Sequence, residues 1–270
     1  MFKKITFIGA GSMAEALIAG IVKSEVLKPN QIHVTNRSNQ SRLQVLNQLY
    51  AIQSTSDTEA AVADADAIFL AMKPKDVAGA LAEIKPFLTK DQVIISILAG
   101  TQTKFIADQL GMDISVIRAM PNTSATIGYG ATGLTKGTFV TEEQIKLAST
   151  LFETVGTVTI VAEEQMHTVT AVAGSGPAYF YYIVEAMEEA AQSGGLNQAD
   201  AKELIYQTIL GAAQMLKQTN EDPALLRRKI TSPGGTTERG IKTLADHKVN
   251  KAIEAAVYQA SNRSKELGEN

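Results

Sequence analysis

Hydroxyl side chains gather around a Pro-Gly-Gly turn near the end of the sequence, in the stretch TSPGGTT at residues 231–237. Glycine adds no side-chain bulk, so such a turn exposes backbone N–H groups, and the helical pattern that follows adds free N–H groups and a favourable dipole. Together these groups could donate hydrogen bonds to a small anion. The turn could also be a helix break in which Thr236 or Thr237 caps the next helix, and the residues alone favour this second interpretation.

A second group of residues suited to ligand chemistry lies near the N-terminus, where GAGSMA at residues 9–14 has the G-x-G-x-x-A spacing. The first glycine permits a tight turn, the second lets the backbone approach a pyrophosphate, and the small third residue lets helix and strand pack closely. Because a strand pattern precedes the turn and a helix pattern follows it, we predict dinucleotide binding rather than a turn without a ligand. The predicted contacts are Ile8, Gly9, Ala10, Gly11, Ser12 and Met13.

The end of the second predicted strand bears on the choice between the two nicotinamide cofactors. NAD enzymes usually carry Asp or Glu at this point to bind the ribose 2′-hydroxyl, whereas this sequence has Asn36, Arg37 and Ser38. Arg37 offers a planar fork for a 2′-phosphate, and its two neighbours add donors. We therefore expect NADPH, with NADH possible. The alternative is that Arg37 is a solvated surface residue.

Three further loops follow predicted strands and so fall at the carboxyl edge of a parallel sheet, where α/β folds bind ligands. They are AMKPKD at residues 71–76, SILAGT at residues 96–101 and RAMPNT at residues 118–123. The predicted cofactor contacts in these loops are Met72, Lys73, Pro74, Ala99 and Asn122.

Hydrophobic patterning predicts the elements that position these residues. Short apolar runs rich in β-branched residues alternate with helical patterns over the first part of the chain. This alternation predicts an α/β fold, with a parallel sheet between two layers of helices, in an N-terminal Rossmann-like doubly wound domain over residues 1–162. The predicted strands are 4–8, 31–35, 67–71, 92–97, 115–118, 131–135 and 157–161, and helices are predicted at 13–24, 42–49 and 142–154, among others.

Residues 163–270 have helical patterns and no convincing strand, which predicts an all-helical C-terminal domain. One stretch within it, from Tyr179 to Tyr182, is bulky and aromatic over most of a helix circumference. Such a helix must be covered on several sides, so we expect a partner subunit. A central helix in a monomer is the alternative. Helices are predicted to begin at Pro177, after Asn197, after Asp222, and at Thr236 or Thr237.

Composition narrows the function classes. The chain has 270 residues, a net charge of −3 and no cysteine, so it has no basic footprint for nucleic acid and no thiolate chemistry. Glu15 interrupts the apolar N-terminal run, which fits a first strand better than a signal peptide, and no later run is long enough for a membrane helix. We expect a cytoplasmic protein. Its three histidines lack the spacing of metal ligands.

These motifs together resemble the pyrroline-5-carboxylate reductase family. The family signature Ser-Pro-Gly-Gly-Thr-Thr is present at residues 232–237. Earlier in the chain, IGAGSMAEAL, NR, AMKP, SILAG, RAMPNT and AVAGSGPAY occur in the family's order. The resemblance implies a Rossmann-like domain with a helical dimerisation domain, and a homo-oligomer that is a dimer or a ring of dimers. It also implies reduction of 1-pyrroline-5-carboxylate, a cyclic imine with a carboxylate, to L-proline by hydride from NAD(P)H, the last step of proline biosynthesis.

The resemblance further implies roles for the turn. Thr237 would be the catalytic donor to the ring nitrogen, and Ser232 and Thr236 would hold the carboxylate. Glu163, at the predicted domain junction, would lie near the substrate. Asp57 stands where the family often has Asn. The resemblance implies that this position contacts the cofactor, although here the side chain is negatively charged rather than neutral. The implied substrate-binding residues are Ser232, Gly234, Gly235, Thr236, Thr237 and Glu163.

Two other functions fit parts of the pattern. A β-hydroxyacid dehydrogenase has the same two-domain layout but needs a lysine in the first long helix of its second domain, and AVAGSGP at residues 171–177 contains none. A non-enzymatic scaffold that senses NADPH and binds a partner protein would not require the hydroxyls of the turn.

Overall fold

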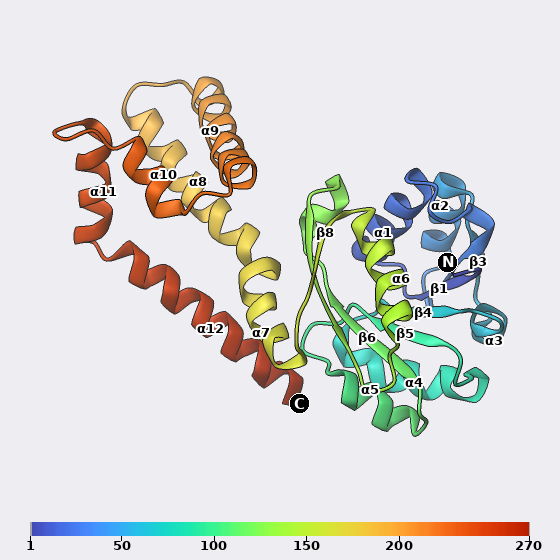
Figure 1. The fold of residues 1–270 in the computed structure, drawn as a ribbon. Coiled ribbons are helices and arrows are strands. Elements are labelled where there is room, and N and C mark those ends of the chain that lie inside the picture. Colours follow the sequence, from blue (N-terminus) through green and yellow to red (C-terminus); the bar gives the residue numbers. More distant parts are fainter. Residues whose placement is uncertain (1, 270) are drawn as a thin grey trace. The chain divides into compact units, whose positions relative to one another are not determined.

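The structure is a computed structural model that describes residues 2–269, so the two ends of the predicted domains, Met1 and Asn270, lie outside it. The described residues form two compact units (Figure 1), an α/β unit of residues 2–175 with 258–269 and a helical unit of residues 176–257. The units divide after residue 175, whereas the sequence places a domain boundary at residue 162. That boundary, between an α/β domain and a helical domain, stays a prediction.

An eight-stranded sheet forms the centre of the α/β unit, with the order β3-β2-β1-β4-β5-β6-β7-β8. Neighbouring strands are parallel except for β6 and β7, which are antiparallel. The strands are β1 (Ile5–Ile8), β2 (Ile32–Thr35), β3 (Gln53–Thr55), β4 (Ala67–Leu70), β5 (Val93–Ser96), β6 (Ser115–Met120), β7 (Gly130–Lys136) and β8 (Gly156–Ile160).

Helices cover both faces of this sheet, because the central strands are apolar on both sides. All four residues of β4 and of β5 are buried. One face packs against α1 (Ser12–Lys23), α2 (Gln40–Tyr50) and α6 (Glu142–Glu153), and the other against α3 (Thr58–Val62), α4 (Val77–Ile84) and α5 (Thr103–Leu110). The predicted doubly wound fold is therefore confirmed.

Two features of the sheet differ from the prediction. The strand β3 was not predicted, because Gln53, Ser54 and Thr55 are polar and form an outer strand without an apolar run. The strand β7 runs antiparallel to β6, because a short 3-10 helix (Thr123–Ile127) joins them in place of a crossover helix. An antiparallel pair can be joined by such a short connection, whereas a parallel pair cannot.

Between residues 163 and 269 the structure describes helices and no strand, as predicted. They are a 3-10 helix (Glu163–Gln165), α7 (Met166–Val169), a π-helix (Thr170–Gly174), α8 (Gly176–Ser193), α9 (Gln198–Thr219), α10 (Pro223–Lys229), α11 (Thr236–Asp246) and α12 (Val249–Glu269). Asn197 caps α9 by accepting a hydrogen bond from the N–H of Asp200 at 3.0 Å, so the predicted cap is confirmed.

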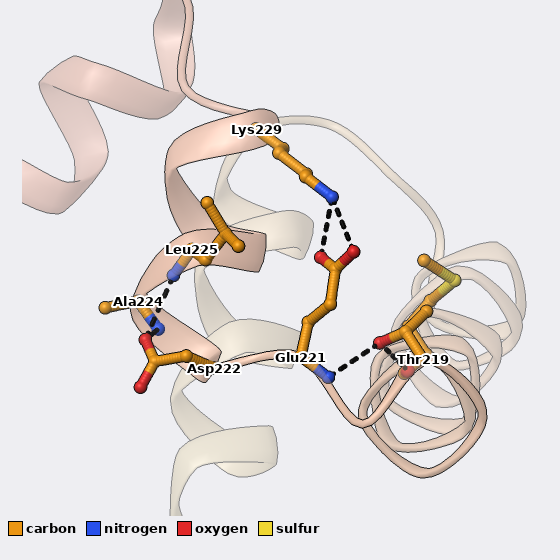
Figure 2. A network of polar contacts seen from close by, with 7 residues as sticks. Thr219, Glu221, Asp222, Ala224, Leu225 and Lys229 are labelled. Atoms are coloured by element: carbon orange, nitrogen blue, oxygen red, sulfur yellow. Dashed lines mark hydrogen bonds and ion pairs between the residues drawn. The ribbon is translucent and has the colours of Figure 1, made fainter.

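The connection between α9 and α10 is fixed by a network of polar contacts (Figure 2). Asp222 accepts hydrogen bonds from the N–H groups of Ala224 at 2.8 Å and Leu225 at 3.2 Å, which caps α10 as predicted. Glu221 forms an ion pair with Lys229 at the other end of the same short helix. The network holds α10 in place directly before the hydroxyl-rich turn.

The helical unit exposes a large apolar surface. On α8, Phe180 and Tyr181 are each 61% exposed and Tyr182 is 76% exposed. Leu204, Tyr206 and Leu210 on α9 are about half exposed. Large apolar side chains that are exposed in this number on one unit indicate an interaction surface.

Candidate active site

The turn after β1 requires its first glycine. Gly9 has a φ of +112°, and a Cβ built on it would lie 2.6 Å from the carbonyl oxygen of Ala71. The N–H of Gly9 donates to the carbonyl oxygen of Thr35 at 2.9 Å, which fixes the turn against β2. Ala14, the small third residue of the motif, is buried in α1. The geometry that the sequence motif predicts is therefore present.

A cleft of about 640 Å³ lies at the carboxyl ends of β1, β2 and β4, beside this turn. Ser56, Thr58 and Lys75 also line it, although the sequence did not single them out. The signal of Ser56 and Thr58 was weak, because they follow the unpredicted strand β3, whereas Lys75 belongs to the loop of residues 71–76 that the sequence indicated. The predicted cofactor residues that line the cleft are Ile8, Gly9, Ala10, Gly11, Asn36, Arg37, Ser38, Met72 and Lys73.

The residues after β2 fit a phosphate group. The side-chain oxygen of Asn36 accepts hydrogen bonds from the N–H groups of Ser38 at 3.1 Å and Asn39 at 3.0 Å, so Asn36 shapes the loop. Arg37 is exposed at the cleft and forms no hydrogen bond or ion pair with any described residue. Its guanidinium is thus free to pair with a phosphate of the ligand.

The remaining predicted cofactor residues do not line this cleft. Asp57 caps α3 by accepting a hydrogen bond from the N–H of Ala60 at 3.1 Å. The amide of Asn122 joins two backbone segments, because it donates to Ala173 at 3.0 Å and accepts from Ala131 at 3.3 Å. Ser12, Met13, Pro74 and Ala99 do not line the cleft either. The cofactor contacts of all these residues, and of those that line the cleft, stay predictions.

An ion pair between a buried arginine and a partly exposed glutamate lies near the carboxyl end of β6. Arg118 is fully buried, and its Nη1 donates to Oε1 of Glu163 at 2.7 Å. The hydroxyl of Thr103 donates to Oε2 of the same carboxylate at 2.8 Å. Both oxygens of Glu163 therefore have partners within the α/β unit. Sequence reasoning missed Arg118, although a charged residue inside the apolar stretch SVIRAM was a signal for it.

His167 lies close to this ion pair and is also buried. Its Nδ1 lies 3.0 Å from the hydroxyl oxygen of Ser264 in α12. Burial lowers the pKa of His167 below its ordinary value of 6.5, and the charges of Arg118 and Lys265 lower it further, while Glu163 and Ser264 act in the opposite direction.

The hydroxyl-rich turn joins α10 and α11 in the helical unit. Gly234 has a φ of +70°, a backbone conformation that favours glycine. The N–H of Gly234 donates to Oε2 of Glu238 at 2.8 Å, and the N–H of Gly235 donates to the carbonyl oxygen of Ser232 at 3.0 Å. Both glycine N–H groups are therefore engaged inside the turn.

The first residues of α11 are open at this turn. Gly235 is the N-cap of α11, and no side chain caps the helix. The predicted cap at Thr236 or Thr237 is therefore wrong, because both residues are already helical, whereas the prediction that a helix begins there is confirmed, because α11 begins at Thr236. The hydroxyls of Ser232, Thr236 and Thr237 form no hydrogen bond with any described residue. Helix geometry leaves the N–H groups of the first turn free as well.

No helix within residues 2–269 is long and apolar enough to cross a bilayer. Within the same described residues, no group of three or more histidine, aspartate or glutamate side chains is placed to bind a metal ion.

Two family models match the chain. The model for pyrroline-5-carboxylate reductase dimerisation matches residues 163–267. The model for coenzyme F420-dependent NADP oxidoreductases matches residues 4–100. The first covers the helices α7 to α11 and most of α12, and the second covers the glycine turn and the cleft.

Similar proteins cover nearly the whole chain. Pyrroline-5-carboxylate reductase 2 of Bacillus subtilis (strain 168) is 47% identical over 99% of this chain and 96% of its own. The reductase of Staphylococcus aureus (strain COL) is 36% identical over 98% and 97%. A solved pyrroline-5-carboxylate reductase from Coxiella burnetii has a TM-score of 0.93 at 38% identity, covering 99% of both chains. A Plasmodium falciparum pyrroline carboxylate reductase with NADP bound has a TM-score of 0.88 at 28% identity, covering 98% of both. The chain therefore belongs to the pyrroline-5-carboxylate reductase family.

Proposed function

We propose that this protein reduces 1-pyrroline-5-carboxylate to L-proline with NADPH, NADH being a second possible donor. The observation that carries the proposal is the turn before α11, where three hydroxyl groups and the free N–H groups of a helix N-terminus have no partner among the described residues. A small substrate with one carboxylate and one ring nitrogen needs such donors.

The cofactor would be held at the cleft of the α/β unit. The glycine turn leaves room for a pyrophosphate above the N-terminus of α1, and a side chain at Gly9 is excluded by the carbonyl of Ala71. Arg37 would pair with the 2′-phosphate of NADPH, and Lys73 adds positive charge to the same cleft. When bound, NADPH supplies the hydride, and the protein supplies position and exclusion of water.

The substrate carboxylate would be held by the hydroxyls of Ser232 and Thr236 and by backbone N–H groups at the start of α11. The dipole of α11 favours a negative charge there. Gly234 and Gly235, which the resemblance implied as substrate contacts, have engaged N–H groups. We propose that these two glycines shape the turn and allow the substrate to approach it closely.

Thr237 would donate its hydroxyl hydrogen bond at the ring nitrogen of the substrate. During reduction the imine carbon gains a hydride and the nitrogen gains a proton, so a donor must orient the nitrogen. A neutral hydroxyl can do this and can relay a proton from water. It is not itself a strong acid, so we propose water as the source of the proton.

The assembly is a homo-oligomer formed through the helical unit. The exposed aromatic face of α8 and the match to a dimerisation model support a dimer as the basic assembly. A ring of dimers is the larger assembly that we propose. The cysteine-free composition suits the reducing interior of a cell, and we propose a cytoplasmic location.

The two competing functions have less support. A β-hydroxyacid dehydrogenase would need a lysine at the start of α8, and residues 171–177 contain none. An NADPH-sensing scaffold gives no reason for the three free hydroxyls. One absorbance assay separates the three functions. Reduction of 1-pyrroline-5-carboxylate consumes NADPH and lowers its absorbance, oxidation of a β-hydroxyacid by NADP forms NADPH and raises it, and a scaffold changes neither. Oxidation of NADPH by the imine with formation of proline is expected, and no reaction with the imine would overturn the proposal.

A further inference from the structure

The last turns of α12 belong to the α/β unit, although α12 begins in the helical unit. Near its end, Gly268 lies directly against the loop of residues 97–101 that follows β5. A Cβ built on Gly268 would lie 2.4 Å from the carbonyl oxygen of Gly100, and a Cβ built on Gly100 would lie 3.3 Å from the N atom of Gly268. Gly100 has a φ of +79°. The two backbones are therefore in a contact that leaves no space for a side chain on Gly268.

A second contact fixes the same end of α12. Ser264 and Ser261 are buried, and the hydroxyl oxygen of Ser264 lies 3.0 Å from Nδ1 of His167. His167 is itself on α7, next to the fully buried Met166. The end of α12 therefore contacts both the loop after β5, through Gly268, and α7, through Ser264.

The loop is also held at its two ends. The N–H of Ile97 donates to the carbonyl oxygen of Leu70 in β4 at 3.1 Å. Thr103, at the start of α5, donates to Glu163, which pairs with buried Arg118. Between these ends, the contact of Gly100 with Gly268 fixes the position of the middle of the loop.

This loop lies where the reactive half of the cofactor would be. The strand order places β2 beside β1, β1 beside β4 and β4 beside β5. With the 2′-phosphate at Arg37 after β2 and the pyrophosphate at the glycine turn after β1, a dinucleotide extends towards β4 and β5. The loop after β5 therefore lies beside the nicotinamide end and away from the adenosine end.

We propose that the end of α12, through Gly268 and Ser264, is a positioning element that holds the loop of residues 97–101 against the nicotinamide end of the cofactor. The inference rests on the proposed use of NADPH. It assigns a role in the α/β unit to residues that the sequence placed in the helical domain, and it makes Gly268 and Ser264 positioning residues rather than catalytic ones.

The test is the substitution Gly268→Ala in the full chain, with Gly79→Ala as the matched control. Both glycines lie in helices of the α/β unit, and alanine is the better helix former at both. A Cβ at Gly79 meets no atom within 4 Å, whereas a Cβ at Gly268 must displace the carbonyl of Gly100. Any loss in Gly268→Ala alone therefore comes from the contact with the loop.

Three measurements distinguish a misplaced nicotinamide from a loss of structure in the whole cofactor site. Binding of 2′,5′-ADP reports the adenosine half of the site, the fluorescence of bound NADPH reports the nicotinamide half, and steady-state kinetics report turnover. We expect Gly268→Ala to leave the affinity for 2′,5′-ADP unchanged, to alter the NADPH fluorescence and to lower kcat on the order of tenfold, because small misplacements of reacting groups have effects of this size. Gly79→Ala should match the wild type in all three.

The inference would be overturned if Gly268→Ala had the NADPH fluorescence and the kcat of the wild type. It would also be overturned if the variant lost affinity for 2′,5′-ADP by the same factor as it lost kcat. If Gly268→Ala does not fold, Ser264→Ala gives the same decision, because it removes only the contact with His167 and should change NADPH fluorescence and kcat in the same direction. Failure of the wild type to oxidise NADPH with 1-pyrroline-5-carboxylate would refute the proposed function, while the fluorescence comparison would still decide the role of α12.

Discussion

Nη1 of Arg118 donates a hydrogen bond to Oε1 of Glu163 at 2.7 Å, and the arginine is fully buried. The family resemblance implied that Glu163 lies near the substrate. In the structure its second carboxylate oxygen is also engaged, by the hydroxyl of Thr103. Nε and Nη2 of Arg118 have no partner in the structure, so the carboxylate is the one charged group that compensates this guanidinium among the described residues.

Replacing Glu163 should therefore affect stability more than substrate binding. Glu163→Ala leaves a buried guanidinium without a counter-charge, and we expect a loss of about 3 kcal/mol in the free energy of unfolding. Glu163→Gln keeps a hydrogen-bond acceptor and should lose less. Urea unfolding of both variants gives these values. A large rise in KM for 1-pyrroline-5-carboxylate in Glu163→Gln, without loss of stability, would instead place Glu163 at the substrate.

Arg37 should determine the preference for NADPH. Arg37→Asp removes the fork for the 2′-phosphate and adds repulsion, and a hydrogen bond to a charged group contributes roughly 1.5–3 kcal/mol. We expect NADPH to bind at least about tenfold more weakly while NADH changes less. Titration of both cofactors measures the ratio. Lys75→Asp, a change at another lining residue, is the control for general loss of positive charge. If the ratio of affinities in Arg37→Asp equals that of the wild type, Arg37 does not select the cofactor.

The sequence predicted most of the sheet because its strands are buried apolar runs, and this signal is strong for β4 and β5. It missed β3, whose three polar residues gain their strand conformation from pairing with β2. It did not give the direction of β7, which depends on a short connection rather than on the residues of the strand. Local patterns do not contain such information.

Some residues of the candidate site could be predicted from the sequence and others could not, for a similar reason. The glycine turn and Arg37 belong to a local motif, and the structure places both at one cleft. The pairing of Arg118 with Glu163 joins residues 45 positions apart, and the contact of Gly100 with Gly268 joins the two halves of the sequence. The charge of Arg118 inside an apolar stretch is visible in the sequence, but the partner of each residue is not, because both pairings depend on the folded chain.

His167 should make the protein less stable at acidic pH. Burial and the nearby charges of Arg118 and Lys265 lower its pKa in the folded state. Below its ordinary pKa of about 6.5, the unfolded state therefore binds a proton that the folded state resists, and stability is lost as the pH falls further. The effect is absent well above pH 6.5.

His167→Gln should flatten the dependence of unfolding free energy on pH between about pH 7 and pH 5. Part of the dependence should remain, because burial and Lys4 also lower the pKa of His33. Urea unfolding across this range measures the change. A variant whose pH dependence equals that of the wild type would show that His167 does not carry the effect.

The exposed apolar face of α8 should be buried in an oligomer. Light scattering on the purified protein should give a mass of at least twice 28.8 kDa. Tyr182→Glu, which places a charge on a side chain that is 76% exposed in the single chain, should weaken the assembly. Lys242→Glu, on the exposed surface of α11, is a control for the change of charge. A fully active wild-type monomer at micromolar concentration would contradict this prediction.

Thr237 provides the most direct test of the proposed chemistry. Its hydroxyl has no partner among the described residues, and Gly235, rather than Thr237, is the N-cap of α11. Thr237→Val keeps the branched shape and removes only the donor, so the free energy of unfolding should change by no more than about 0.5 kcal/mol.

The same variant should be slow, because loss of one well-placed donor costs on the order of tenfold to a thousandfold in rate. Thr237→Ser keeps the donor and should retain much of the activity. The affinity for NADPH should stay nearly constant in both, since the glycine turn belongs to the α/β unit and Thr237 to the helical unit. Single-turnover reduction of 1-pyrroline-5-carboxylate, measured beside urea unfolding, distinguishes the two effects. A folded Thr237→Val variant that reduces the imine at the wild-type rate would show that another group orients the ring nitrogen.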